Sequence, residues 1–257
     1  MRTPRAPWLL DYAYAHRGLW RQGAAPENSL PAFAAARMAG LGVELDVRIS
    51  ADGEAMVFHD STLERMTKAK GYTNSRTAAE LSRLRLLGHE ATIPTLAEAL
   101  DVLEDTPTLV ELKVNHGSEG PLERRVVHVL AHHPGPVAVM SFNPATLSEI
   151  AGLAPDLPRG LLCEGWRRGH APLFPWTRRA LVRAFTETPH PPPDFIACEV
   201  SALATFGRPA AETLRAPLIA WTVRTRAQID RAERHAHAMI FENLDPGLVR
   251  PARTELV

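Results

Sequence analysis

The chain has 257 residues, of which 45% are hydrophobic and 23% are charged, a composition typical of a globular protein with enough apolar material for a full core. Lys and Arg together number 29, as do Asp and Glu, so no bulk charge directs the protein to nucleic acid. No apolar run approaches the roughly 20 residues of a membrane-spanning helix, and the apolar stub near the start is too short for a secretory signal. We therefore expect neither nucleic-acid binding nor stable membrane insertion.

Short β-rich runs alternate with helical patterns along the chain. The predicted strands cover residues 12–15, 43–48, 108–112, 137–142, 159–163, 195–199, 218–223 and 238–241. The predicted helices cover residues 29–39, 96–104, 122–131, 144–152, 176–186, 208–214 and 225–235. Ser29 is a typical N-cap residue for the first helix. Eight strands with intervening helices favour the α/β class and a (β/α)8 barrel, also called a TIM barrel, formed by a single domain over residues 1–257.

Residues 61–92 do not fit this alternation. The segment is polar, contains the breakers Gly71 and Gly88, and follows an extended piece at 55–58. Its apolar residues are scattered, without a long apolar face. We interpret it as a small insertion after the second strand, placed over the carboxyl-terminal face of the barrel, where βα loops build active sites.

Charged residues interrupt two of the predicted strands. Because side chains alternate between the faces of a strand, Glu44 and Asp46 share one face, and so do Glu111 and Lys113. Buried carboxylates are costly unless they meet a cation, form an ion pair or shift their pKa. Hard divalent cations such as Mg²⁺ or Ca²⁺ prefer oxygen ligands of this kind, so the pattern indicates a metal site. An ion-pair network is the alternative interpretation.

Two histidines follow strands near the same face of the barrel. His16-Arg17-Gly18 comes after the first strand, and His59 ends the extended piece beyond the second. The planar guanidinium of Arg17 suits phosphate oxygens, and Gly18 allows a close backbone approach. Phosphoryl chemistry needs one group to remove a proton and another to donate one, which two histidines supply. Taken alone, the first motif also fits an ordinary surface loop.

Other residues near strand ends have two interpretations each. Glu27 and Asn28 precede the first helix and either support the site or belong to a capping loop. Phe142 and Trp221 close two predicted strands and either line a pocket or fill the barrel as buried aromatics. Glu199 ends another strand and either reaches the pocket or has a structural role.

The order of these motifs resembles that of the glycerophosphodiester phosphodiesterase family. Between Tyr14 and about Pro246 the chain carries, in order, HRG, PENS, ExD, HD, IPTL, ELK, SFN, WTV and FENxDP. The resemblance implies a TIM barrel with a small insertion and one divalent metal ion, Mg²⁺ or Ca²⁺. It also implies hydrolysis of a small-molecule substrate, a glycerophosphodiester, to sn-glycerol 3-phosphate and an alcohol. The last motif is the loosest match, because the family more often shows Thr-Asp where this chain has Phe241-Glu242-Asn243.

The resemblance also implies roles by motif position. His16 and His59 would be the catalytic acid and base, and Glu44, Asp46 and Glu111 would hold the metal. The substrate-binding residues would be Arg17, Lys113, Phe142 and Trp221, and the supporting residues Glu27, Asn28 and Glu199.

Rival functions remain open at the level of sequence. A phosphodiesterase of the lysophospholipase D type would use the same residues on a long-chain lipid and would need an apolar groove, for which residues 161–175 are candidates through Trp166, Leu173 and Phe174. A catalytically silent barrel that binds glycerophosphodiesters is a second rival. A metal-dependent sugar-phosphate isomerase or aldolase is a third, although it does not use the two histidine motifs. The polar insertion favours a small polar substrate over a lipid.

The two cysteines, Cys163 and Cys198, share no CxxC spacing. The sequence therefore predicts neither a zinc site nor a disulfide framework. Two free thiols are typical of a reducing compartment, and together with the lack of a recognisable targeting segment they predict a cytoplasmic location.

Overall fold

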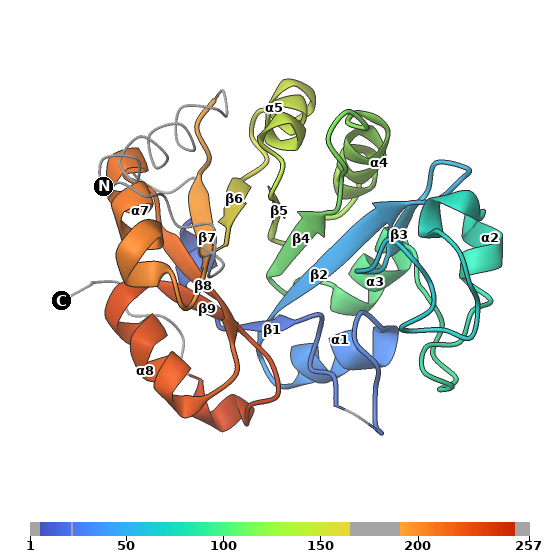
Figure 1. Ribbon diagram of the computed structural model, residues 1–257, viewed down its shortest axis with the longest axis horizontal. Helices are drawn as coiled ribbons and strands as arrows, with labels where there is room; N and C mark the ends of the chain where they lie inside the picture. The colour runs from blue at the N-terminus through green and yellow to red at the C-terminus, as the bar shows by residue number, and fades with distance from the viewer. Residues whose placement is uncertain (1–5, 22, 165–190, 250–257) are drawn as a thin grey trace, which may run out of the picture.

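Eight parallel strands form a closed ring in the computed structural model, which describes residues 6–21, 23–164 and 191–249 (Figure 1). Going around the ring, the strands are β1 (Tyr14–His16), β2 (Gly42–Ile49), β4 (Thr108–Leu112), β5 (Val137–Ser141), β6 (Arg159–Cys163), β7 (Phe195–Glu199), β8 (Leu218–Val223) and β9 (Ala238–Phe241). The short strand β1 closes the ring, because it pairs in parallel with both β2 and β9. The predicted barrel is therefore confirmed.

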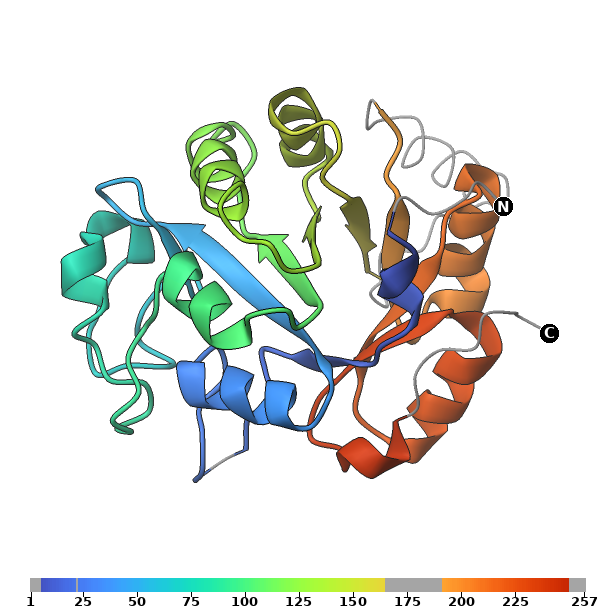
Figure 2. The same cartoon turned by 180° about the vertical axis from the view of Figure 1, so that it is seen from behind.

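Helices surround the ring on its outer side (Figure 2). They are α1 (Leu30–Met38), α3 (Leu96–Leu103), α4 (Pro121–Leu130), α5 (Pro144–Leu153), α7 (Arg208–Leu214) and α8 (Arg226–His235), with short helical turns η1 (Pro7–Leu10), η3 (Leu203–Gly207) and η4 (Pro246–Leu248). Ser29 caps α1 as predicted, since its side chain accepts a hydrogen bond from the backbone N–H of Ala32. The helix predicted at 176–186 lies outside the described residues. Among those residues, no helix combines the length and apolar composition needed to cross a membrane.

The alternation of side chains along β2 produces two cores. Val43, Leu45 and Val47 belong to the layer between the ring and the helices. The interior of the ring is filled by residues from alternate positions of the other strands and by one residue of η1, among them Leu9, Tyr14, Leu109, Met140, Leu162, Phe195, Ile219 and Ile240. Glu44 and Asp46 point to this interior face. The interior is therefore apolar along most of its depth and charged at the carboxyl-terminal end.

The insertion after β2 begins with β3 (Ala55–Val57), which pairs antiparallel with β2, and continues through η2 (Thr73–Ser75) and α2 (Ala78–Leu81). It forms the side of the molecule beyond β2 in Figure 1. Its apolar residues, which look scattered in the sequence, gather into a small core of their own: Met56, Phe58, Leu63, Met66, Leu81, Leu86 and Ile93. The insertion is thus a packed unit with most of its large apolar side chains turned inward, although Tyr72 and Leu87 are exposed.

The two cysteines lie closer than their sequence spacing suggests. Cys163 of β6 is the register partner of Cys198 in β7, and both side chains are free thiols and buried. Burial, followed by the neighbouring Cys198, raises the pKa of the Cys163 thiol well above its ordinary value.

A test of the interior packing uses two glycines. A Cβ on Gly160 in β6 would come within 2.1 Å of the Phe195 ring, which is fully buried in the barrel. We expect Gly160→Ala to lower the free energy of unfolding by about 1–3 kcal/mol, because the ring has no space to move into. Gly152→Ala in α5 is the control, since nothing lies within 4 Å of its added Cβ and alanine is the better helix former. Equal stability of the two variants in urea unfolding would contradict the packing described here.

Candidate active site

Three buried carboxylates converge at the carboxyl-terminal end of the barrel. Glu44 and Asp46 project from β2 and Glu111 from β4, where Asp46 and Glu111 are register partners. At most 6% of each residue is exposed, and one oxygen from each lies within 4.8 Å of the others. The alternation of the strands and the register between them therefore create the acidic cluster that the sequence predicts.

Two cations lie against this cluster. The Lys113 ammonium is 3.0 Å from Asp46 Oδ1 and 2.5 Å from Glu111 Oε1, and the Arg17 Nε is 3.1 Å from Asp46 Oδ2. Burial would raise the pKa of Asp46, but Lys113 and Arg17 outweigh it and hold the pKa well below its usual range. Three acids face two cations, so the cluster retains a negative charge when fully ionised.

Glu44 carries the clearest sign of a missing positive partner. Its Oε2 accepts the Arg17 backbone N–H at 3.1 Å, whereas its buried Oε1 has no hydrogen-bond partner. Burial, and then the charges of Asp46 and Glu111, raise the pKa of Glu44 well above its ordinary value. Burial likewise raises the pKa of Glu111 to about 7. Three oxygen donors with an orphaned carboxylate oxygen fit a hard divalent cation.

Each predicted catalytic histidine is held by a carboxylate. His16 Nδ1 lies 2.5 Å from Glu242 Oε2, and His59 Nδ1 lies 2.6 Å from Asp60 Oδ1. Burial lowers the pKa of both histidines, although the Glu242 hydrogen bond works against it at His16 and Asp46 works against it at His59. Both rings therefore keep Nε2 as the nitrogen available for proton transfer.

A pocket of about 140 Å³ connects the histidines with the acidic cluster. Its walls include His16, His59 and Lys113 together with two aromatic rings, Phe142 and Trp221. The two rings meet edge to face, with centroids 5.5 Å apart. Phe142 is 39% exposed and stands at the rim, while the Trp221 indole N–H donates to the Ala197 carbonyl at 3.0 Å. Both aromatics thus line the pocket.

The residues before α1 support the cluster from behind. Asn28 donates from Nδ2 to Asp46 Oδ2 at 2.9 Å and accepts from the Asp46 backbone N–H at 3.3 Å. Glu27 accepts from two guanidinium groups, Arg17 at 2.8 Å and Arg65 at 2.7 Å. Glu27 therefore orients arginines. Arg17, which the sequence predicts as a phosphate ligand, is itself paired with Glu27 and Asp46.

Neither Glu199 nor Gly18 is part of the pocket wall that the described residues form. Glu199 ends β7, accepts the Ser201 hydroxyl at 2.8 Å and does not contribute to the described pocket wall. Gly18 has φ +82°, and a Cβ there would meet the Ala32 backbone at 2.9 Å. Gly18 therefore allows its own backbone to pack closely against α1. The turn formed in this way directs the Arg17 backbone N–H toward Glu44.

Sequence reasoning missed the carboxylate that holds His16. Glu242 directly follows β9, and the pairing of Ala15 with Phe241 places it beside His16. Arg224, after β8, forms an ion pair with Glu242 on its other side. The sequence signal that could have identified Glu242 and Arg224 is their position, because each directly follows a barrel strand at the carboxyl-terminal face, where active-site residues lie.

Comparisons with known proteins agree with this geometry. Residues 16–245 match the model of the glycerophosphoryl diester phosphodiesterase family. The chain is 31% identical over 161 residues to a glycerophosphodiester phosphodiesterase of Caldanaerobacter subterraneus, and 32% identical over 162 residues to one of Bacillus altitudinis. Each match covers 58% of this chain, which spans 65% of the length of either relative.

A solved structure extends the likeness over the whole barrel. A phosphodiesterase of Oleispira antarctica, solved in complex with the product sn-glycerol-3-phosphate, superposes with a TM-score of 0.75 and 25% identity. The likeness covers 94% of this chain and 96% of that one. Together with the family match over residues 16–245, it shows that this chain belongs to the glycerophosphoryl diester phosphodiesterase family.

Proposed function

We propose that the protein hydrolyses glycerophosphodiesters to sn-glycerol 3-phosphate and an alcohol, with one divalent cation, Mg²⁺ or Ca²⁺. The observation that carries the proposal is the buried cluster of Glu44, Asp46 and Glu111 in the same pocket as two carboxylate-held histidines. The product complex of the Oleispira relative supports the same substrate class. We also propose that residues 1–257 act as one domain, including the insertion at 61–92, in the cytoplasm.

The first requirement of this reaction is to neutralise the negative charge of the phosphate. When bound, the cation would neutralise the nonbridging phosphate oxygens and polarise the phosphorus centre. Lys113 reaches the same pocket and adds a fixed positive charge, while its ion pairs with Asp46 and Glu111 keep the ammonium in place. Arg17 contributes mainly by orienting Asp46, and its guanidinium adds positive potential at the pocket wall.

Proton transfer is the second requirement. One of His16 and His59 removes the proton of the nucleophile, and the other protonates the leaving alkoxide. Burial favours the neutral form of both imidazoles, while Glu242 and Asp60 fix which ring nitrogen faces the substrate. The same pair serves attack by the adjacent glycerol hydroxyl, through a cyclic phosphate that water then opens, and direct attack by water.

The packing of the insertion supports a small polar substrate over a lysophospholipid. Most of its large apolar residues pack in their own core, and among its described residues Tyr72 and Leu87 are the exposed ones. The insertion therefore offers little apolar surface to an acyl chain, each methylene of which would contribute about 0.8 kcal/mol only when buried. The apolar loop that a lipid groove would draw on, residues 161–175, lies mostly outside the described residues.

Metal dependence can be tested by removal and by binding. Chelation should abolish release of sn-glycerol 3-phosphate from glycerophosphocholine, and Mg²⁺, Ca²⁺ or Mn²⁺ should restore it. Glu44→Gln should weaken metal binding in calorimetry at least about tenfold while keeping the circular dichroism spectrum, because it removes one charged oxygen ligand. Glu90→Gln is the control, because the Glu90 side chain is 86% exposed and pairs with Arg85, away from the acidic cluster. Full turnover by metal-free protein would contradict the assignment.

The histidine pair can be tested by truncation. His16→Ala and His59→Ala should each lower kcat by roughly 10²–10⁴, the usual contribution of a positioned proton-transfer group. His132→Ala, in the exposed turn after α4, serves as the control and should keep wild-type kcat. Either catalytic variant that keeps more than a tenth of wild-type turnover removes that residue from the pair.

The Glu242 contact predicts a shift in the pH profile. The Glu242 carboxylate stabilises the charged form of His16, so Glu242→Gln should lower the pKa of His16. The limb of the kcat/KM profile that reports His16 should then move to lower pH, with a fall in kcat and a smaller change in KM. Glu233→Gln on the exposed side of α8 should leave the profile in place. An unshifted profile for Glu242→Gln would show that the contact does not tune His16.

A further inference from the structure

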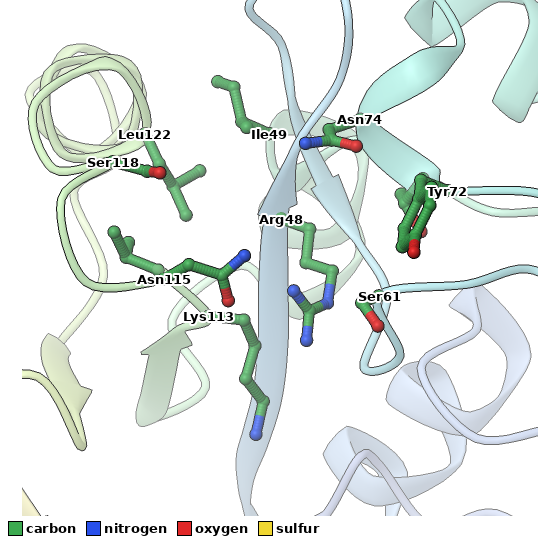
Figure 3. Close-up of a pocket in the computed structure, with 11 residues that line it drawn as sticks. Arg48, Ile49, Ser61, Tyr72, Asn74, Lys113, Asn115, Ser118 and Leu122 are labelled. Atoms are coloured by element: carbon green, nitrogen blue, oxygen red, sulfur yellow. The ribbon is translucent and has the colours of Figure 1, made fainter.

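A second cavity adjoins the active-site pocket at Lys113, which lines both. It measures about 220 Å³, enough for several water molecules or a small polyol. Figure 3 shows it between β2, the loop after β4 and the insertion. A phosphodiester has two ester arms that diverge from one phosphorus. If the phosphate lies at Lys113, the active-site pocket can take one arm and this second cavity the other.

Arg48 supplies the cation of this cavity. It follows Asp46 by two positions on β2, and since Val47 pairs with Leu112, the next residues, Arg48 and Lys113, are neighbours on adjacent strands. Figure 3 shows both side chains along the same face of β2. The Arg48 Nε donates to the His59 carbonyl at 2.7 Å. In the described part of the chain, no carboxylate lies within ion-pair distance of its guanidinium.

The remaining polar groups of the cavity come from two sides. Asn115 and Ser118 belong to the loop after β4, while Asn74 and Ser61 belong to the insertion (Figure 3). Within residues 6–164, neither the Asn115 nor the Asn74 side-chain amide has a hydrogen-bond partner. Such amides both donate and accept, so they match alcohol hydroxyl groups, which do the same.

The other pocket has a different character. Its aromatic wall, Phe142 and Trp221, presents ring surface to a short carbon skeleton, which suits the glycerol arm. The Arg48 cavity holds two cations, Arg48 and Lys113, with amides and hydroxyls beside a more apolar part formed by Ile49, Tyr72, Val114 and Leu122. No carboxylate lines its described wall. A quaternary ammonium group would meet the positive charges of Arg48 and Lys113 there, with no carboxylate in the described wall to pair with it.

Resting on the proposed function, we infer that the Arg48 cavity binds the alcohol arm of the diester and selects hydroxyl-rich alcohols without positive charge, such as glycerol or inositol, over choline. Arg48 and the two asparagines are the specificity-determining residues. The hydrogen bond from the Arg48 guanidinium to the His59 backbone carbonyl places this arm on the His59 side of the phosphate.

The test compares two substrates that differ only in the alcohol. Wild-type kcat/KM should be at least about tenfold higher for glycerophosphoglycerol than for glycerophosphocholine. Arg48→Gln should reduce that ratio about tenfold, since a hydrogen bond from a charged donor is lost for one substrate and a repulsion is relieved for the other. Asn115→Ala, which does not touch His59, should reduce the ratio about threefold. Arg83 is an exposed cation of the insertion and lies outside the cavity. Arg83→Gln should therefore leave kcat/KM unchanged for both substrates.

The possible outcomes distinguish a failure of the proposed alcohol subsite from a failure of the proposed hydrolase function. Arg48→Gln could lower kcat/KM equally for both substrates while Asn115→Ala leaves the ratio of the two kcat/KM values unchanged. That result would show that Arg48 only positions His59 and would overturn the inference. A wild-type preference for glycerophosphocholine would overturn it as well, while leaving the hydrolase function standing. If the metal-loaded protein hydrolyses neither diester, the proposed function itself fails and the subsite fails with it.

Discussion

Charge compensation inside the barrel is the constraint on which the site depends. An isolated buried carboxylate costs several kcal/mol, so three of them are stable in the interior only where cations reach them. Lys113 bridges two of the three, and Arg17 meets Asp46 from the opposite direction. The arrangement leaves Glu44 short of a partner, and that deficit is what a divalent ion fits.

The residues that surround the acidic cluster are held in place by contacts with it and with one another. Arg17 reaches Asp46 because the turn at Gly18 presses its backbone against α1. Asn28 uses both ends of its amide on Asp46, and Glu27 ties Arg17 to Arg65 of the insertion. The insertion is therefore linked to the acidic cluster through Glu27, which pairs with both Arg65 and Arg17.

Local periodicity explains which features could be predicted from sequence. The inward direction of Glu44 and Asp46 depends only on the two-residue period of a strand, and the convergence of strand ends depends only on the barrel. The helix bounds agree closely because capping residues such as Ser29 act within one turn. The insertion has no repeating backbone, so no period revealed that Leu63, Met66 and Leu81 share a core.

Pairings between distant segments could not be predicted in the same way. The contact of Glu27 with Arg65 requires the insertion to fold back over the barrel mouth. The contact of His16 with Glu242 requires the register of β1 against β9. The environment of Arg48 could not be predicted either, because only the folded neighbours show which arginines lack a carboxylate partner among the described residues.

The closure of the ring by β1 has a consequence for biosynthesis. His16 and Glu242 are 226 positions apart, so the His16 ring of β1 is held by Glu242 only once β9 has paired beside β1. A growing chain on the ribosome carries the acidic cluster and both histidines long before it can complete that contact. The contact that orients the His16 ring can therefore form only after residue 242 has been synthesised, and it joins segments that are far apart in the sequence, a kind of contact that slows folding.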